Sequence, residues 1–294
     1  MSIIHLTAEY SATYASFIRD YSSQHSIVVP ASSDLARILE ALDWFGSFPP
    51  DSFQPETAFE ADKSKALRLF LYLDQGVRIA IALKWSLTLP GSDLIAKRLT
   101  SPLDRLATQD ETAQDLFFEL DIAQKLLSRG AKVRIGEPDI LLTFGDTEVG
   151  IACKRPRGLK GIGKRIHQGV SQLRKNGVAG FVVVGLESIF HRPPTPGIRP
   201  ILYESNDQES FRVHLTRIAD QAFMRSKAAV AYAFSQDVLG VLFCGMATAL
   251  SKQPSAYIYQ WVRKPVSNPV HPGDAELLDE MIFTRPPLLE KAPQ

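Results

Sequence analysis

A carboxylate and an ammonium group are predicted to lie close together on one β-hairpin. They belong to Asp139 and Lys154, near the two ends of the segment EPDILLTFGDTEVGIACKRP. A carboxylate can hold a hard divalent cation through oxygen, and an adjacent ammonium can stabilise the charge that develops on a phosphoryl group during hydrolysis. This pair of residue types therefore indicates chemistry on a phosphodiester.

The hairpin itself is predicted from two apolar, β-branched runs that flank a Gly-Asp dipeptide, which is typical of tight turns. A two-residue turn makes Phe144 face Thr147. Continued along both strands, this register places four side chains on one face, in the pairs Asp139 with Ala152 and Glu137 with Lys154.

Another carboxylate, that of Glu119, is expected on the apolar side of a helix. The segment from Glu111 to Arg129 carries leucine, isoleucine and alanine at helical spacing, and Glu119 lies inside that apolar arc. Burial of a charged carboxylate is costly unless a cation or hydrogen-bond donors meet it. Glu119 is therefore expected either to bind a metal ion together with Asp139 or to form a structural ion pair with a basic residue such as Lys154.

Beyond this helix, short strands alternate with helices, which indicates an α/β fold with a mixed sheet. The expected elements are three short strands, a basic helix from Gly163 to Lys175, a strand from Ala179 to Leu186 and a helix from Ser210 to Arg225. Three apolar runs, at residues 228–234, 238–250 and 256–262, are predicted to enlarge the sheet.

Residues 1–105 are predicted to form a mainly helical region, with Ser33 and Ser92 as helix N-caps. The segment FPPDSFQPET is a predicted loop, and the apolar segment from Val77 to Leu89 fits a buried strand or a buried helix. The predicted organisation is thus a helical region at 1–105, an α/β core at 106–284 and a flexible tail at 285–294. The sequence does not choose among three roles for the helical region, which are target recognition, formation of a homodimer and docking of a protein partner.

Composition sets few limits on function. The 294 residues carry a formal net charge of +1, so any electrostatic attraction for nucleic acid must be local. The two cysteines lack the spacing of a zinc site and favour a reducing, cytoplasmic setting. The longest apolar run, residues 238–250, is too short to span a bilayer, so a soluble protein without membrane association is expected.

The order of these elements resembles the PD-(D/E)XK nuclease superfamily, the restriction-endonuclease-like fold, over about residues 111–190. The resemblance rests on a helix with an inward glutamate, a Pro-Asp strand, a strand ending in lysine, and a basic helix. It implies that Glu119 is the helical acid, Asp139 the metal-binding aspartate and Lys154 the catalytic lysine. The second acid of the motif falls at Ala152, whose methyl group cannot bind a metal.

Two outcomes follow from Ala152: another oxygen replaces the lost carboxylate, or the protein binds nucleic acid without cutting it. The candidate replacements are Glu119, Glu137 and Glu148. Mg²⁺ keeps several water ligands, so Asp139, Glu119 and the backbone carbonyl of Cys153 could suffice to hold Mg²⁺ or Mn²⁺. Two structural readings remain open as well: Glu137 could form a cross-strand salt bridge with Lys154, and Asp139 could cap a turn.

Positive charge is concentrated directly after Lys154, where residues 154–175 contain no acidic residue. A face of the predicted helix could follow a phosphate backbone, although most charged helix faces are simply solvated. A glutamine on this helix, Gln168 or Gln172, also resembles one that related nucleases place there. Nucleic acid, with DNA favoured, is therefore the expected partner. The residues predicted to contact it are Arg155, Arg157, Lys160, Lys164, Arg165, Gln168, Gln172 and Lys175.

Part of this basic segment also fits a different function, the binding of a nucleotide by a phosphate loop. Residues 158–164 match the phosphate-loop spacing GxxxxGK and follow a predicted strand. The next residue is Arg165, where such loops have a serine or threonine that holds Mg²⁺, and Pro156 interrupts the passage from strand to loop. Nucleotide hydrolysis is thus a less favoured alternative.

Overall fold

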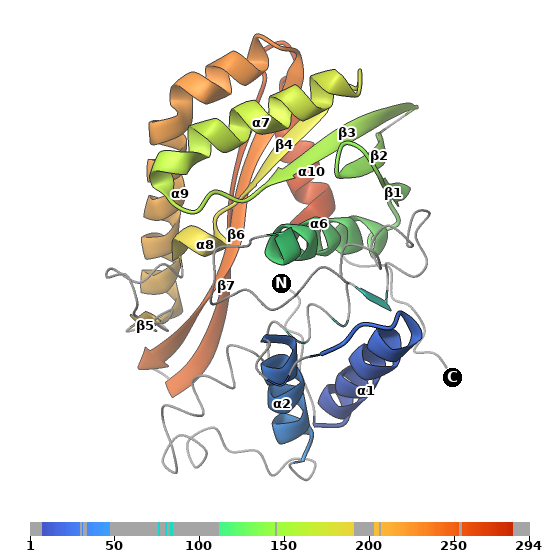
Figure 1. The fold of residues 1–294 in the computed structure, drawn as a ribbon. Coiled ribbons are helices and arrows are strands. Elements are labelled where there is room, and N and C mark those ends of the chain that lie inside the picture. The colour runs from blue at the N-terminus through green and yellow to red at the C-terminus, as the bar shows by residue number, and fades with distance from the viewer. Residues whose placement is uncertain are drawn as a thin grey trace. The chain divides into compact units, whose positions relative to one another are not determined.

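The computed structural model describes residues 8–29, 31, 34–47, 76, 80, 83–84, 112–144, 146–190, 203–205, 207–252 and 255–284. The chain divides into two compact units, residues 1–124 and 125–294 (Figure 1). Both predicted N-caps, the predicted loop FPPDSFQPET, most of the segment from Val77 to Leu89, and the predicted tail at 285–294 lie outside the described residues.

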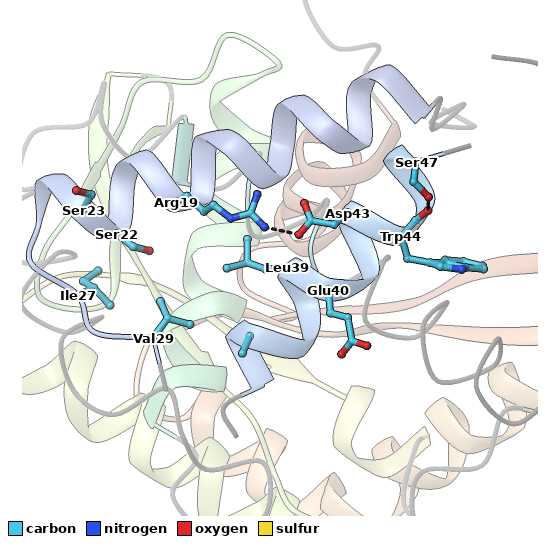
Figure 2. Close-up of a pocket in the computed structure, with 11 residues that line it drawn as sticks. Arg19, Ser22, Ser23, Ile27, Val29, Leu39, Glu40, Asp43, Trp44 and Ser47 are labelled. Carbon is cyan, nitrogen blue, oxygen red and sulfur yellow. Dashed lines mark hydrogen bonds and ion pairs between the residues drawn. The ribbon is translucent and has the colours of Figure 1, made fainter. Parts of the chain in front are cut away.

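The N-terminal unit contains α1 (Ala8–Gln24), α2 (Asp34–Gly46) and most of α6 (Thr112–Leu127), which continues into the second unit. Helices α1 and α2 pack together through buried apolar residues such as Ile18 and Leu42, and the Ser11 hydroxyl donates to the Leu42 carbonyl oxygen at 2.8 Å. An open groove of about 860 Å³ runs along the pair, and an ion pair between Arg19 and Asp43 crosses it (Figure 2).

Among its described residues, the second unit is built on a mixed seven-stranded sheet. Three short antiparallel strands come first: β1 (Val133–Ile135), β2 (Ile140–Phe144) and β3 (Thr147–Lys154). Strand β4 (Gly180–Gly185) then lies parallel to β3, and β6 (Val238–Lys252) lies parallel to β4. Strand β6 is long: beyond β4 it pairs with β5 (Tyr203–Ser205), and along its other edge it pairs with the antiparallel β7 (Ser255–Ser267).

Two helices cover one face of this sheet and lie side by side (Figure 1). They are α7 (Ile162–Lys175), which follows a short 3₁₀ turn at Leu159–Gly161, and α9 (Gln208–Phe234). Because α7 connects two adjacent parallel strands, β3 and β4, it forms a βαβ crossover. The short helix α8 (Glu187–Phe190) follows β4, and α10 (Asp274–Asp279) with the π-helical turn Glu280–Thr284 follows β7.

The helix period in the sequence predicts correctly which side of α7 is buried. Ile166, Val170 and Leu173 are buried, and they join a hydrophobic core with Ala152 of β3 and Val182 of β4. The opposite side of α7 therefore remains available for other contacts, with its polar and basic residues largely exposed.

One predicted strand is wrong. Residues 228–234 were expected to enlarge the sheet, but they form the last two turns of α9. The run contains four alanines and buries Ala229, Val230 and Ala233, which fit one side of a helix. The two later apolar runs are strands as predicted, although β6 and β7 both extend beyond the predicted ends.

Gly180 holds the parallel strands β3 and β4 at a close approach that no other residue permits. A Cβ atom at this position would lie 1.9 Å from the carbonyl oxygen of Gly150. We expect Gly180→Ala to lower the free energy of unfolding by about 3 kcal/mol, because backbone must shift to relieve the overlap. Urea denaturation measures the effect. Gly163→Ala is the matched control, since its Cβ would meet only Ala229, at 3.6 Å, and should leave stability unchanged or raise it slightly.

Candidate functional site at the end of strand β3

The carboxylate of Asp139 and the ammonium group of Lys154 lie close together, as the sequence predicts, and they form an ion pair. Lys154 Nζ lies 2.8 Å from Asp139 Oδ2, and the two side chains are only 14% and 11% exposed. The same Nζ donates to the carbonyl oxygen of Cys153 at 2.9 Å, and the backbone N–H of Cys153 donates to Asp139 Oδ2 at 2.7 Å. These hydrogen bonds connect the turn before β2 to the end of β3.

Helix α7 contributes a third side chain to this cluster, Gln172. Its Nε2 donates to Asp139 Oδ1 at 2.8 Å and to Glu137 Oε2 at 3.1 Å. Of the two glutamines considered from sequence, Gln172 is thus the one at the site, whereas Gln168 is exposed and accepts a bond from Arg165 at 3.2 Å. The site therefore joins three elements: the turn before β2, the end of β3, and α7.

A glycine in β3 allows the turn to approach the strand. A Cβ at Gly150 would lie 2.5 Å from the ring of Pro138 and 2.8 Å from Leu173 of α7. The peptide bond between Glu137 and Pro138 is cis. Since Gly150 has no side chain, Pro138 packs onto β3 beside α7, and the adjacent Asp139 reaches Lys154 and Gln172.

The predicted register is confirmed within the strands and fails at their end. Phe144 pairs with Thr147 as expected, but the ladder stops where Ile140 pairs with Ile151, and residues 137–139 form a bend. The cross-strand salt bridge between Glu137 and Lys154 is therefore wrong.

Ala152, at which the resemblance places the second acid of the motif, is part of the hydrophobic core. Its side chain is fully buried, and a Cβ added at Gly169 of α7 would lie 3.5 Å from the Ala152 Cβ. The α7 backbone thus covers Ala152 directly. A carboxylate that replaces the second acid would have to come from another residue.

Glu148 cannot replace it. Strand alternation places Glu148 on the same side as Lys154, but six residues of strand separate them by about 20 Å. Glu148 is exposed and receives two hydrogen bonds from Arg134, at 2.7 and 3.0 Å, which lower the pKa of its carboxyl group. It forms a surface ion pair, so its predicted role as a replacement ligand is wrong.

Glu119 lies in the part of α6 that belongs to the N-terminal unit, and its burial is confirmed at 4% exposed. Its shared metal site with Asp139 stays a prediction. Among the described residues, no three or more histidine, cysteine, aspartate or glutamate side chains gather as a metal site would require. Any ion at this site would therefore depend on other oxygen atoms or on water.

The oxygen atoms around Lys154 suit a hard cation. Asp139 Oδ2 and the Cys153 carbonyl oxygen are both within 2.9 Å of Lys154 Nζ, so they converge on one position. Mg²⁺ is commonly held by one or two protein oxygens and completed by water. The donor set thus fits Mg²⁺ or Mn²⁺, while the Cys153 thiol is buried and does not take part through its sulfur.

Most of the predicted nucleic-acid contacts lie at the surface. Arg155 is the exception: it is only 7% exposed and donates to the Ser188 hydroxyl of α8 at 2.8 Å. Its predicted contact with a phosphate backbone is therefore wrong, and it fixes α8 near the end of β3. The residues that are exposed are Arg157, Lys160, Lys164, Gln168 and Lys175, with Arg165 and Gln172 half-buried.

A contact between α7 and α9 adds to this surface and carries no signal in the sequence. The exposed ring of His167 lies 4.5 Å from that of Tyr232, measured between ring centroids. These residues are 65 positions apart, and neither belongs to a motif. Only the packing of α7 beside α9 brings them together.

The glycines at residues 158–164 do not form an open phosphate loop. The Gly161 N–H donates to the Gly158 carbonyl oxygen at 2.9 Å within the 3₁₀ turn, and Lys164 lies on the exposed side of α7. A phosphate loop uses such N–H groups to bind phosphate oxygens. The Gly161 N–H is therefore already used within the turn.

No helix in the described part of the chain is long and apolar enough to cross a membrane. Comparisons of the chain with protein-family models, with curated proteins and with solved structures find no match.

Proposed function

We propose that this protein is a metal-dependent nuclease with a restriction-endonuclease-like core, and that DNA is its preferred substrate. The observation that carries the proposal is the convergence of Asp139, Lys154 and Gln172 at the end of β3. A carboxylate, an ammonium and an amide on one side of a mixed sheet, followed by a basic helix, suit the hydrolysis of a phosphodiester.

Each residue has a distinct role in this proposal. Asp139 and the Cys153 carbonyl would hold Mg²⁺ or Mn²⁺, with Glu119 proposed as a further ligand. When bound, the ion would supply Lewis-acid polarisation of the phosphodiester and would lower the pKa of a water molecule. Lys154 donates to the phosphate oxygens that gain charge in the transition state. Gln172 orients the Asp139 carboxylate through Oδ1 and links it to Glu137.

A second candidate function is nucleic-acid binding without cleavage. It is favoured by Ala152, because the residue that would supply the second carboxylate is buried beneath α7. In that case the Asp139–Lys154 pair is structural, and the basic residues of α7 provide the affinity.

One assay separates the two candidates. The full chain is incubated with single-stranded DNA, duplex DNA and RNA in the presence of Mg²⁺, Mn²⁺ or a chelator. Cleavage that requires the metal supports the nuclease, whereas binding without cleavage under every condition supports the second candidate. If the protein neither binds nor cleaves any of these nucleic acids, both proposals are wrong.

The exposed lysines of α7 should contribute to nucleic-acid affinity through phosphate contacts. We expect Lys164→Ala and Lys175→Ala each to weaken binding and to reduce the slope of log K against log salt by about 0.9, the value for one released counterion. Fluorescence anisotropy with labelled duplex DNA over a range of salt measures this slope. Lys132→Ala is the control, because Lys132 is exposed beside the edge strand β1 and should leave the slope unchanged.

A further inference from the structure

The ammonium group of Lys154 occupies the point on which the two cation-binding oxygens converge. Its Nζ lies 2.8 Å from Asp139 Oδ2 and 2.9 Å from the carbonyl oxygen of Cys153. These are the same two atoms that would hold a divalent ion. The lysine and the ion therefore require the same ligands.

The hydrogen bonds of Asp139 leave no free position on Oδ2. A carboxylate oxygen has two lone pairs. On Oδ2, one accepts the Cys153 N–H and the other accepts Lys154 Nζ, while Oδ1 accepts Gln172. The Cys153 N–H belongs to the backbone of β3, which is held in the sheet by β4. Only the Lys154 side chain can leave Oδ2, so a cation that binds this atom must displace it.

Charge leads to the same conclusion. The Asp139 and Lys154 charges cancel, so the closed pair offers a divalent ion little net attraction. An ammonium that stayed within a few ångströms of the ion would also repel it, and it would do so strongly because both side chains are largely buried. Displacement of Lys154 removes both obstacles, provided that its ammonium finds another anion.

We propose that Lys154 and a divalent cation compete for Asp139 Oδ2 and the Cys153 carbonyl oxygen. The cation then binds weakly to the free protein and more tightly when a phosphate group of nucleic acid gives Lys154 a new partner. The second half of this proposal rests on the proposed function, since it assumes that nucleic acid enters the site. By thermodynamic linkage, the cation must strengthen nucleic-acid binding by the same factor.

The competition is tested with Mn²⁺ alone, by titrating the full chain and measuring free Mn²⁺ by electron paramagnetic resonance. We expect Lys154→Met to bind Mn²⁺ at least about tenfold more tightly than the wild type, within the usual range of coupling between sites. Asp139→Asn should lose this binding. Lys227→Met, which removes an exposed lysine of α9, is the charge-matched control and should behave as the wild type.

Lys154→Gln serves as a second variant. Its polar end suits the polar surroundings of position 154, so it keeps the test valid if Lys154→Met does not fold. Thermal unfolding establishes that each variant is folded before it is titrated. The proposal is overturned if the folded variants at position 154 bind Mn²⁺ no more tightly than the wild type, since the ion would then use the remaining lone pair of Oδ1 or another site.

A second titration adds an oligothymidine with phosphorothioate linkages, which resist hydrolysis. Wild-type affinity for Mn²⁺ should rise about tenfold, whereas Lys154→Met should show no change. If Lys154→Met binds Mn²⁺ more tightly but the oligonucleotide has no effect, the competition stands and the coupling to nucleic acid is wrong. If the wild type cleaves DNA with Mg²⁺ but Lys154→Met shows no gain in Mn²⁺ affinity, the nuclease stands and the competition is wrong.

Discussion

Asp139→Asn is expected to reduce metal-dependent cleavage of DNA about a thousandfold. The neutral amide presents one oxygen and one NH₂ group, so it is a poor cation ligand and no longer attracts Lys154. A metal ion supplies several kcal/mol of transition-state stabilisation, and each 1.36 kcal/mol corresponds to about a tenfold change in rate. The rate of cleavage of a labelled duplex under single-turnover conditions measures the loss.

Asp146→Asn is the matched control for this variant. It makes the same substitution on the same hairpin, but Asp146 is exposed in the turn between β2 and β3. Its cleavage rate should equal that of the wild type. Wild-type cleavage by folded Asp139→Asn would contradict the assignment of Asp139 and would point to a contaminating nuclease.

Lys154→Met is expected to lower the cleavage rate about a hundredfold, the cost of removing one donor to the charge that develops in a transition state. Methionine has similar length but donates no hydrogen bond. The loss should appear in the rate constant at saturating Mn²⁺, because the ion is expected to bind this variant more tightly. Slow cleavage together with tight Mn²⁺ binding would separate the two roles of the lysine.

A different outcome would assign Lys154 a structural role. If Lys154→Met unfolds at a lower temperature but cleaves at the wild-type rate when folded, the lysine only supports the hairpin. Lys227→Met again provides the control, with both stability and cleavage unchanged.

The sequence predicts that Asp139 and Lys154 lie close together because both belong to one hairpin, whose register follows from a two-residue turn. Alternation along the hairpin and the sharp turn are sufficient to bring Asp139 near Lys154. The same logic fails for Glu137, because strand pairing does not continue through Pro138, which has no N–H for the ladder. The Glu137 carboxylate instead accepts a hydrogen bond from Gln172.

Other errors arise where local sequence says nothing of distant partners. A positive charge after a strand indicates an exposed residue, yet Arg155 is buried and donates a hydrogen bond to Ser188 of α8, which lies 33 positions further along the chain. Periodicity gives the burial of Glu119 in α6 correctly, since that depends only on the position within one helix. The error at Glu148 is of another kind: alternation places it on the side of Lys154, but six residues at the rise of a strand already set the two about 20 Å apart, which the sequence alone could have shown.

The close contact at Gly169 limits which side chains position 152 can carry. A Cβ at Gly169 would already lie 2.9 Å from Val182, so α7 rests on the sheet with no spare room above Ala152. A glutamate introduced at position 152 would have to lift the helix, and that would also move Gln172 away from Asp139. A second carboxylate at position 152 would therefore require coordinated changes in strand and helix, and Ala152→Glu alone is expected to destabilise the protein.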